Sequence, residues 1–135
     1  MKTDRYLFKP VNRSRYTGDL SYLRARSSWE ITFMEHLDLH PAVMCWNYEP
    51  FFIPYLNPLW PDRVSKYLPD FWVECSGRGG EEMKFIVEIK PAKHLVLAAT
   101  AGQDERFRYI VNQAKFKAAR SFAVQQGATF RILTR

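Results

Sequence analysis

Residues 67–90 read YLPDFWVECSGRGGEEMKFIVEIK, two segments of alternating apolar and polar residues separated by a glycine-rich turn. Alternation with a period of two is the pattern of β-strands, and glycines at a short junction favour a hairpin. The residues expected on the apolar face are Phe71, Val73, Cys75, Phe85, Val87 and Ile89. This stretch therefore predicts a β-hairpin that buries one face in a core.

The opposite face of the predicted hairpin carries Asp70 on the first strand and Glu88 and Lys90 on the second. Strand pairing can bring Asp70 across from Glu88, at about 5 Å between Cβ atoms. Two carboxylates this close repel each other unless a cation lies between them. Oxygen ligands without a histidine or cysteine cluster favour Mg²⁺ or Mn²⁺. We therefore expect Asp70 and Glu88 to hold a metal ion.

The same three residues predict a reaction. A bound metal ion lowers the pKa of a water molecule, and a lysine beside it can orient that water or stabilise charge on a phosphate. Asp70, Glu88 and Lys90 together therefore indicate hydrolysis of phosphodiester bonds. The structural alternative is an edge hairpin in which these side chains form only a cross-strand salt bridge.

Periodicity elsewhere in the chain predicts an α/β fold. The expected elements are helices over 28–39 and 104–126 and short strands over 43–48, 51–55 and 129–133. A Pro-rich loop is expected after the second strand, and Gly127 fits the C-cap of the second helix. This order predicts a sandwich in which helices flank a small central mixed β-sheet.

Composition indicates one soluble domain. A chain of 135 residues, 47% of them hydrophobic, can bury a single core without disulfides. Cys45 and Cys75 lack metal-ligand spacing and are expected to be reduced packing residues of an intracellular protein. The sequence shows neither a secretion signal nor an apolar run of about 20 residues, so no membrane association is expected.

Positive charge gathers at the two ends, with +5 over residues 1–26, +7 over 106–135 and −6 over 27–105. Basic flanks around an acidic centre suit a protein that grips a polyanion, although solvated surface charge is the alternative. We expect residues 1–26 to form a basic arm that orders only by docking, ahead of one domain over 27–135. The arm offers phosphate contacts from Arg13, Arg15, Arg24 and Arg26.

Two features of the predicted helices bear on the same chemistry. Glu30 falls within the apolar stripe of the first helix, where an unpaired carboxylate is costly, although a capping box from Ser27 to Glu30 is an alternative explanation. One flank of the second helix carries Arg106, Gln113, Lys117 and Arg120. This flank is expected to touch phosphates, with a solvated basic face as the alternative.

The segments 27–30 (SSWE), 67–71 (YLPDF) and 87–91 (VEIKP), taken in order, resemble the PD-(D/E)XK nuclease superfamily. The local sequence over residues 16–30, 53–55 and 69–73 is similar to that of the head completion nucleases of tailed bacteriophages. The catalytic half of the DNA-cleaving subunit of heteromeric transposons is similar in motif order, including residues 112–115 (NQAK).

The resemblance implies a restriction-endonuclease-like fold and a Mg²⁺-dependent endonuclease, with Mn²⁺ as a possible substitute. It implies Glu30, Asp70 and Glu88 as the acidic, metal-binding residues and Lys90 as the catalytic lysine, and it adds Lys115 to the residues that contact DNA. Glu49 and Gln113 are further candidates for the site, with an exposed charge at a strand end as the alternative for Glu49. For the phage family it also implies a role in finishing the DNA-filled head.

The expected substrate is therefore packaged or terminal DNA, and the expected location is the host cytoplasm or the virion. Portal or other head proteins are expected partners, and a homodimer would supply the two active sites that double-strand cleavage needs. One alternative is a structural head-closure protein that binds DNA without cutting it. Another is an RNA-binding protein, for which the 16% aromatic content could supply stacking platforms.

Overall fold

The computed structural model describes residues 6–134 of the chain. Its α-helices are α1 (Ser28–Leu39) and α2 (Gln103–Gln125), and its short 3₁₀ helices are η1 (Arg13–Arg15), η2 (Leu20–Tyr22) and η3 (Ala92–His94). The strands are β1 (Tyr6–Leu7), β2 (Arg24–Ala25), β3 (Val43–Tyr48), β4 (Ile53–Leu56), β5 (Val64–Tyr67), β6 (Phe71–Ser76), β7 (Glu82–Ile89) and β8 (Thr129–Leu133). No helix among these residues is long and apolar enough to cross a membrane.

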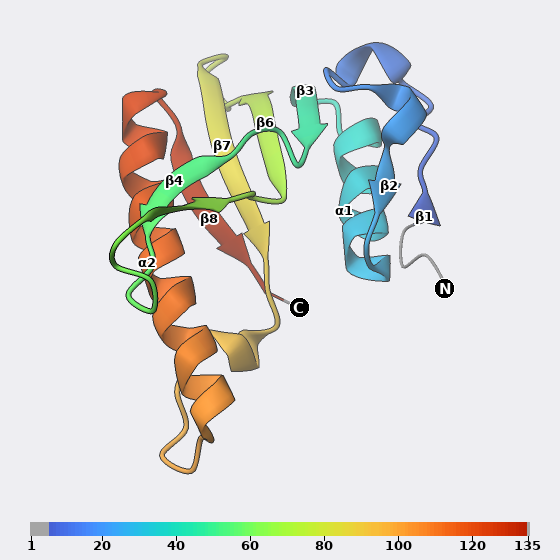
Figure 1. Ribbon diagram of the computed structural model, residues 1–135. Coiled ribbons are helices and arrows are strands. Elements are labelled where there is room, and N and C mark those ends of the chain that lie inside the picture. The colour runs from blue at the N-terminus through green and yellow to red at the C-terminus, as the bar shows by residue number, and fades with distance from the viewer. Residues whose placement is uncertain (1–5, 135) are drawn as a thin grey trace.

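A mixed four-stranded sheet in the order β3-β6-β7-β8 forms the centre of the fold. The first two pairings are antiparallel, whereas β8 runs parallel to β7 after the long α2 crossover. Figure 1 shows α1 and the N-terminal segment on one side of this sheet, and α2 with the β4–β5 ribbon on the other. The predicted sandwich of helices around a small mixed sheet is thus confirmed.

The predicted hairpin forms, and its two faces enter two different cores. Phe71 and Val87 pack with Trp46 and residues of α1, while Ile86 packs with Ala119 of α2 on the other side. Phe71 pairs with Val87, so the next step of the register brings Asp70 to Glu88. The alternating pattern of the hairpin therefore delivers both carboxylates to the α2 side of the sheet.

Two expectations about local structure are corrected. The Pro-rich loop forms, but the sequence missed β5 directly after it, whose four residues pair with β4 and form a two-stranded ribbon. The predicted apolar stripe of α2 is also shorter than expected, because Phe107 and Ile110 are 39% and 40% exposed. These residues lie on the N-terminal part of α2, which extends past the central sheet in Figure 1.

The N-terminal segment is held against α1 by one buried carboxylate. Asp38, only 2% exposed, accepts hydrogen bonds from the backbone amides of Val11 (2.7 Å) and Asn12 (2.9 Å). Arg15 donates to the carbonyl oxygens of Asp38 (3.1 Å) and His40 (2.7 Å), where α1 ends. Residues 6–26 therefore dock on the domain through backbone bonds as well as through apolar contacts.

Asp38→Ala is expected to lower the free energy of unfolding by about 2 kcal/mol, because a buried N–H left without a partner costs about 1–3 kcal/mol. Urea unfolding measures this change, and trypsin should cut the basic N-terminal segment faster in the variant. Asp62→Ala, which removes an exposed carboxylate, is the control. Equal stability of the two variants would mean that Asp38 does not anchor the segment.

Candidate active site

Asp70 and Glu88 meet at one end of the hairpin. Asp70 lies immediately before β6, and Glu88, 6% exposed, lies near the end of β7. The Asp70 Oδ2 atom accepts a 2.7 Å hydrogen bond from the backbone amide of Ile89. This bond ties the Asp70 carboxylate to the strand that carries Glu88, so the two acidic groups are held together by the sheet itself.

The two carboxylates perturb each other strongly. Burial, with the nearby charge of Glu88, raises the pKa of Asp70 to about 8. Burial also raises the pKa of Glu88, against the opposing effects of Tyr67, Lys90 and Lys115. Burial and the closeness of the two groups therefore disfavour full negative charge on the pair, and a divalent cation between two oxygen ligands would favour it.

Two side chains hold the Glu88 carboxylate from different sides. The Tyr67 hydroxyl donates a short hydrogen bond to Oε1, and the Lys90 ammonium lies 3.5 Å from Oε2. The ion pair thus joins two residues of one strand, while the residues facing each other across the hairpin are two acids. A cross-strand salt bridge does not describe this arrangement.

Glu30 combines a structural contact with a place near the acidic pair. Ser27 Oγ accepts from the Glu30 amide at 3.2 Å, as the capping alternative expects, but the Glu30 carboxylate accepts from the amide of Arg26 (2.7 Å) rather than from that of Ser27. The same oxygen, Oε1, accepts from the Tyr48 hydroxyl at 2.8 Å. The charge of Glu30 also contributes to the raised pKa of Asp70, so the capping contacts and the placement beside the site coexist.

The donor set suits a hard divalent cation. Within residues 6–134, no three His, Cys, Asp or Glu side chains form a ready-made metal cage. The Asp70–Glu88 pair supplies carboxylate oxygens from two residues, and Mg²⁺ in proteins is commonly held by one or two carboxylates while it keeps several waters and meets substrate phosphates. Asp70 and Glu88 therefore fit the ion. Glu30 accepts the bonds from Arg26 and Tyr48 on the same oxygen, Oε1, so its part in holding the ion stays a prediction.

The basic residues predicted on α2 separate into different environments. Lys115 is half-buried, with its Nζ 5.6 Å from the centre of the Tyr67 ring. Gln113 and Lys117 instead line a hollow of about 570 Å³ between α2 and the β4–β5 ribbon, and Arg120 is exposed. Only Lys115 of this set approaches the carboxylates.

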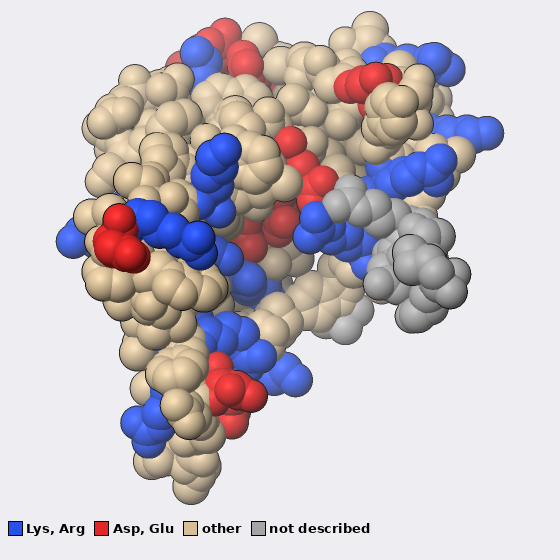
Figure 2. Space-filling view, viewed as in Figure 1, with Lys and Arg blue, Asp and Glu red and all other residues tan. Residues whose placement is uncertain are grey.

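The four arginines predicted to contact phosphates from the N-terminal segment also separate. Arg15 donates to two carbonyl oxygens at the end of α1, and Arg26 forms a 3.0 Å ion pair with Glu49. Arg13 and Arg24 are exposed and, with Lys9, line a hollow of about 370 Å³. Figure 2 shows acidic side chains gathered in the middle of one face with basic side chains on either side of them.

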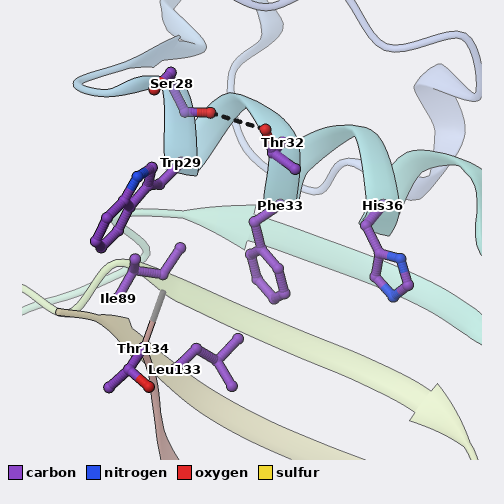
Figure 3. Close-up of a pocket in the computed structure, with 8 residues that line it drawn as sticks. All are labelled: Ser28, Trp29, Thr32, Phe33, His36, Ile89, Leu133 and Thr134. Carbon is purple, nitrogen blue, oxygen red and sulfur yellow. Dashed lines mark hydrogen bonds between the residues drawn. The ribbon is translucent and has the colours of Figure 1, made fainter. Parts of the chain in front are cut away.

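An apolar groove of about 550 Å³ lies on the other side of β7. Figure 3 shows Trp29, Phe33 and His36 of α1 facing Ile89 and Leu133 at the ends of β7 and β8. Successive side chains of a strand point to opposite faces, so β7 itself separates the Ile89 side chain from Glu88. The groove is therefore a neighbour of the carboxylate site and not a part of it.

Sequence reasoning missed the two tyrosines that hold the acidic groups, Tyr48 for Glu30 and Tyr67 for Glu88. Both are buried, at 6% and 4% exposure. The available signal was that a buried tyrosine hydroxyl needs a hydrogen-bond partner. The partner could not be named from the sequence, because β3 and β5 belong to different sheets and their spatial relation to the acids is set by tertiary packing.

A mixed sheet between two helices, with a carboxylate pair and a lysine at the end of a central strand, defines an endonuclease of the PD-(D/E)XK type. Residues 40–135 match the family model described as TnsA-like endonuclease N terminal, and the chain belongs to this family. It is also 38% identical over 135 residues to the head completion nuclease of Enterobacteria phage T4, with 93% of this chain and 87% of that protein covered. Asp70, Glu88, Lys90 and Lys115 lie within the family match, and Glu30 precedes it.

Proposed function

We propose that this endonuclease hydrolyses phosphodiester bonds of DNA with Mg²⁺ as its cofactor and acts on packaged or terminal DNA when a phage head is completed. The observation that carries the proposal is the buried Asp70–Glu88 pair beside Lys90. The likeness to a head completion nuclease supports the biological setting. A purely structural role is not favoured, because a DNA binder gains nothing from clustered acids beside a phosphate backbone.

Asp70 and Glu88 would hold the ion, which supplies a more acidic bound water and neutralises charge on the phosphate oxygens. The Ile89 amide and the Tyr67 hydroxyl fix one oxygen of each carboxylate, and the second Glu88 oxygen lies beside the Lys90 ammonium, so both carboxylates have a set orientation. Lys90 lies at the open end of β7, with its ammonium directed to Glu88. From there it can orient the attacking water or stabilise the developing negative charge.

Metal choice, location and oligomeric state complete the proposed setting. Mn²⁺ is proposed as a substitute for Mg²⁺, because both are hard ions with octahedral oxygen coordination. The protein is proposed to act in the host cytoplasm or in the virion, beside portal or other head proteins. A homodimer is proposed for double-strand cleavage, since one active site cuts one strand at a time.

The test is a cleavage assay with supercoiled, linear and single-stranded DNA in Mg²⁺, Mn²⁺ or EDTA, with RNA of the same sequence as the competing substrate. We expect supercoiled DNA to be nicked or linearised with either metal, and no cleavage in EDTA. DNA binding without cleavage under all metal conditions would support the structural alternative instead. Preferential cleavage of RNA would overturn the assignment of the substrate.

Arg13 and Arg24 are expected to position DNA without reading its sequence, because backbone contacts carry no base information. Replacing both by alanine should weaken binding to unrelated sequences equally. It should also flatten the salt dependence by up to about 0.9 log unit per decade of salt for each duplex phosphate that the variant no longer neutralises. Binding titrations at several salt concentrations measure this slope, with Arg78→Ala in the exposed β6–β7 turn as the control. An unchanged slope would show that the N-terminal arm does not contact the DNA backbone through Arg13 and Arg24.

A further inference from the structure

The position of Lys115 differs from that of the other basic residues on α2. Its Nζ lies over the face of the Tyr67 ring at 5.6 Å from the centroid, and the hydroxyl of that ring donates to Glu88. Glu88 in turn receives Lys90 on its other oxygen. Lys90, directly after β7, therefore pairs with the Glu88 carboxylate, and Lys115 of α2 lies against the tyrosine that holds the same carboxylate.

The surroundings of Lys115 are those of an active-site cation. The side chain is half-buried, and burial together with the charge of Lys90 lowers its pKa, whereas the charge of Glu88 raises it. Geometrically, Lys115 is linked to Glu88 through Tyr67, whose ring faces the lysine and whose hydroxyl donates to the carboxylate. A lysine that only contacts the DNA backbone can remain exposed to solvent. Lys117 and Arg120 are exposed in this way, whereas Lys115 is half-buried.

We propose that Lys115 is a second catalytic cation, which contacts the phosphate undergoing hydrolysis from the α2 side while Lys90 contacts it from the β7 side. The inference rests on the proposed function and adds a substrate contact to it. A phosphate that meets the Asp70–Glu88 pair lies between the two lysines, and both can neutralise charge that develops on its non-bridging oxygens. The contact with the Tyr67 ring restrains the Lys115 ammonium, which lowers the entropy lost when the phosphate binds.

The test separates chemistry from binding in the full chain. Lys115→Met keeps most of the side-chain volume but removes the charge, and its single-turnover rate at saturating DNA and Mg²⁺ should fall by about two orders of magnitude. Its DNA affinity, measured without metal, should change by less than about threefold. Lys115→Arg keeps the charge and the ring contact and should recover part of the rate. Arg78→Ala, with one exposed charge removed, is expected to cleave normally.

Lys117→Ala and Arg120→Ala provide the comparison along the same helix, with weaker DNA binding and a flatter salt slope expected. If Lys115→Met behaves like these two variants, with reduced affinity and a normal rate at saturation, Lys115 only touches the DNA backbone and the inference is wrong. Thermal unfolding shows whether the Met variant is folded, and the Arg variant supplies the same comparison if it is not. Absence of cleavage by the unmodified protein would refute the proposed function, which is a different result.

Discussion

Asp70→Asn is expected to reduce Mg²⁺-dependent cleavage by at least about a thousandfold, since a metal ion contributes several kcal/mol to a phosphoryl transition state and each 1.36 kcal/mol is tenfold in rate. Asparagine retains an oxygen that can accept the hydrogen bond from the Ile89 amide, so the strand contact persists. Glu88→Gln should have a comparable effect. Single-turnover cleavage with saturating DNA measures both losses.

The same substitution has a distinct signature in stability. The pKa of Asp70 is about 8 in the folded protein against 3.8 for the ordinary side chain, so the folded state binds more protons between about pH 4 and pH 8. The titration of Asp70 therefore makes the free energy of unfolding of the metal-free protein fall as pH rises through this window. Asp70→Asn should remove that decline, and Mg²⁺ should oppose it in the unmodified protein but not in the variant.

Urea unfolding at several pH values, with and without Mg²⁺, gives the required comparison. Asp62→Asn serves as the control, because this carboxylate is exposed in the β4–β5 connection. Two results would count against the site: full cleavage by Asp70→Asn, or a pH dependence of stability that is the same in both variants. The first would show that Asp70 is not a metal ligand, and the second would show that burial and Glu88 do not raise the pKa of Asp70.

Lys90→Ala is expected to lower turnover by about two to four orders of magnitude, the range for losing a positioned proton or charge partner. DNA affinity should fall much less. If Lys90 served only as the ion-pair partner of Glu88, whose oxygen lies 3.5 Å away, its loss would change stability slightly and leave cleavage within a few-fold of normal. The ratio of the change in rate to the change in affinity therefore distinguishes the two roles.

Lys90→Arg sharpens the comparison. Arginine keeps the positive charge, but its guanidinium is broad and a weaker acid, so it replaces a compact ammonium poorly at a single water. We expect a low rate in this variant as well. Lys93→Ala removes a nearby exposed lysine in η3 and should cleave normally. A normal single-turnover rate for Lys90→Arg at saturating Mg²⁺ would show that the lysine supplies charge alone.

Much of the fold follows from local patterns. The Ser27 cap and the apolar spacing after it predict α1, and alternation in the hairpin predicts that Phe85 and Val87 face a core. The second core, which contains Ile86, was not predicted, because only the packing of α2 shows that the opposite face is also covered. The strand β5 was missed because four residues carry little periodicity, and their conformation depends on pairing with β4. The exposure of Phe107 and Ile110 was missed because periodicity finds an apolar stripe without showing how far the sheet extends beneath it.

The candidate site was likewise predictable from the sequence only in part. Asp70, Glu88 and Lys90 were predictable together because one hairpin register sets their relation. The different environments of Lys115, Lys117 and Arg120 were not, because residues on one helical flank look alike until the packing of α2 on Tyr67 is known. The pairing of Arg26 with Glu49 was equally hidden, since it depends on how the N-terminal segment docks.

Strand β8 supports the active site but is synthesised after the residues that form it. The backbone amide of Lys90 donates to the carbonyl oxygen of Leu133 at 3.0 Å, and Leu133 follows Lys90 by 43 residues. Such distant parallel pairing forms late, because the ordering cost of the intervening chain comes before any gain from the contact. A partly synthesised chain that carries Asp70, Glu88 and Lys90 but not yet residues 129–133 thus lacks the strand that holds this lysine in place, and we expect the active site to form only after β8 has paired with β7.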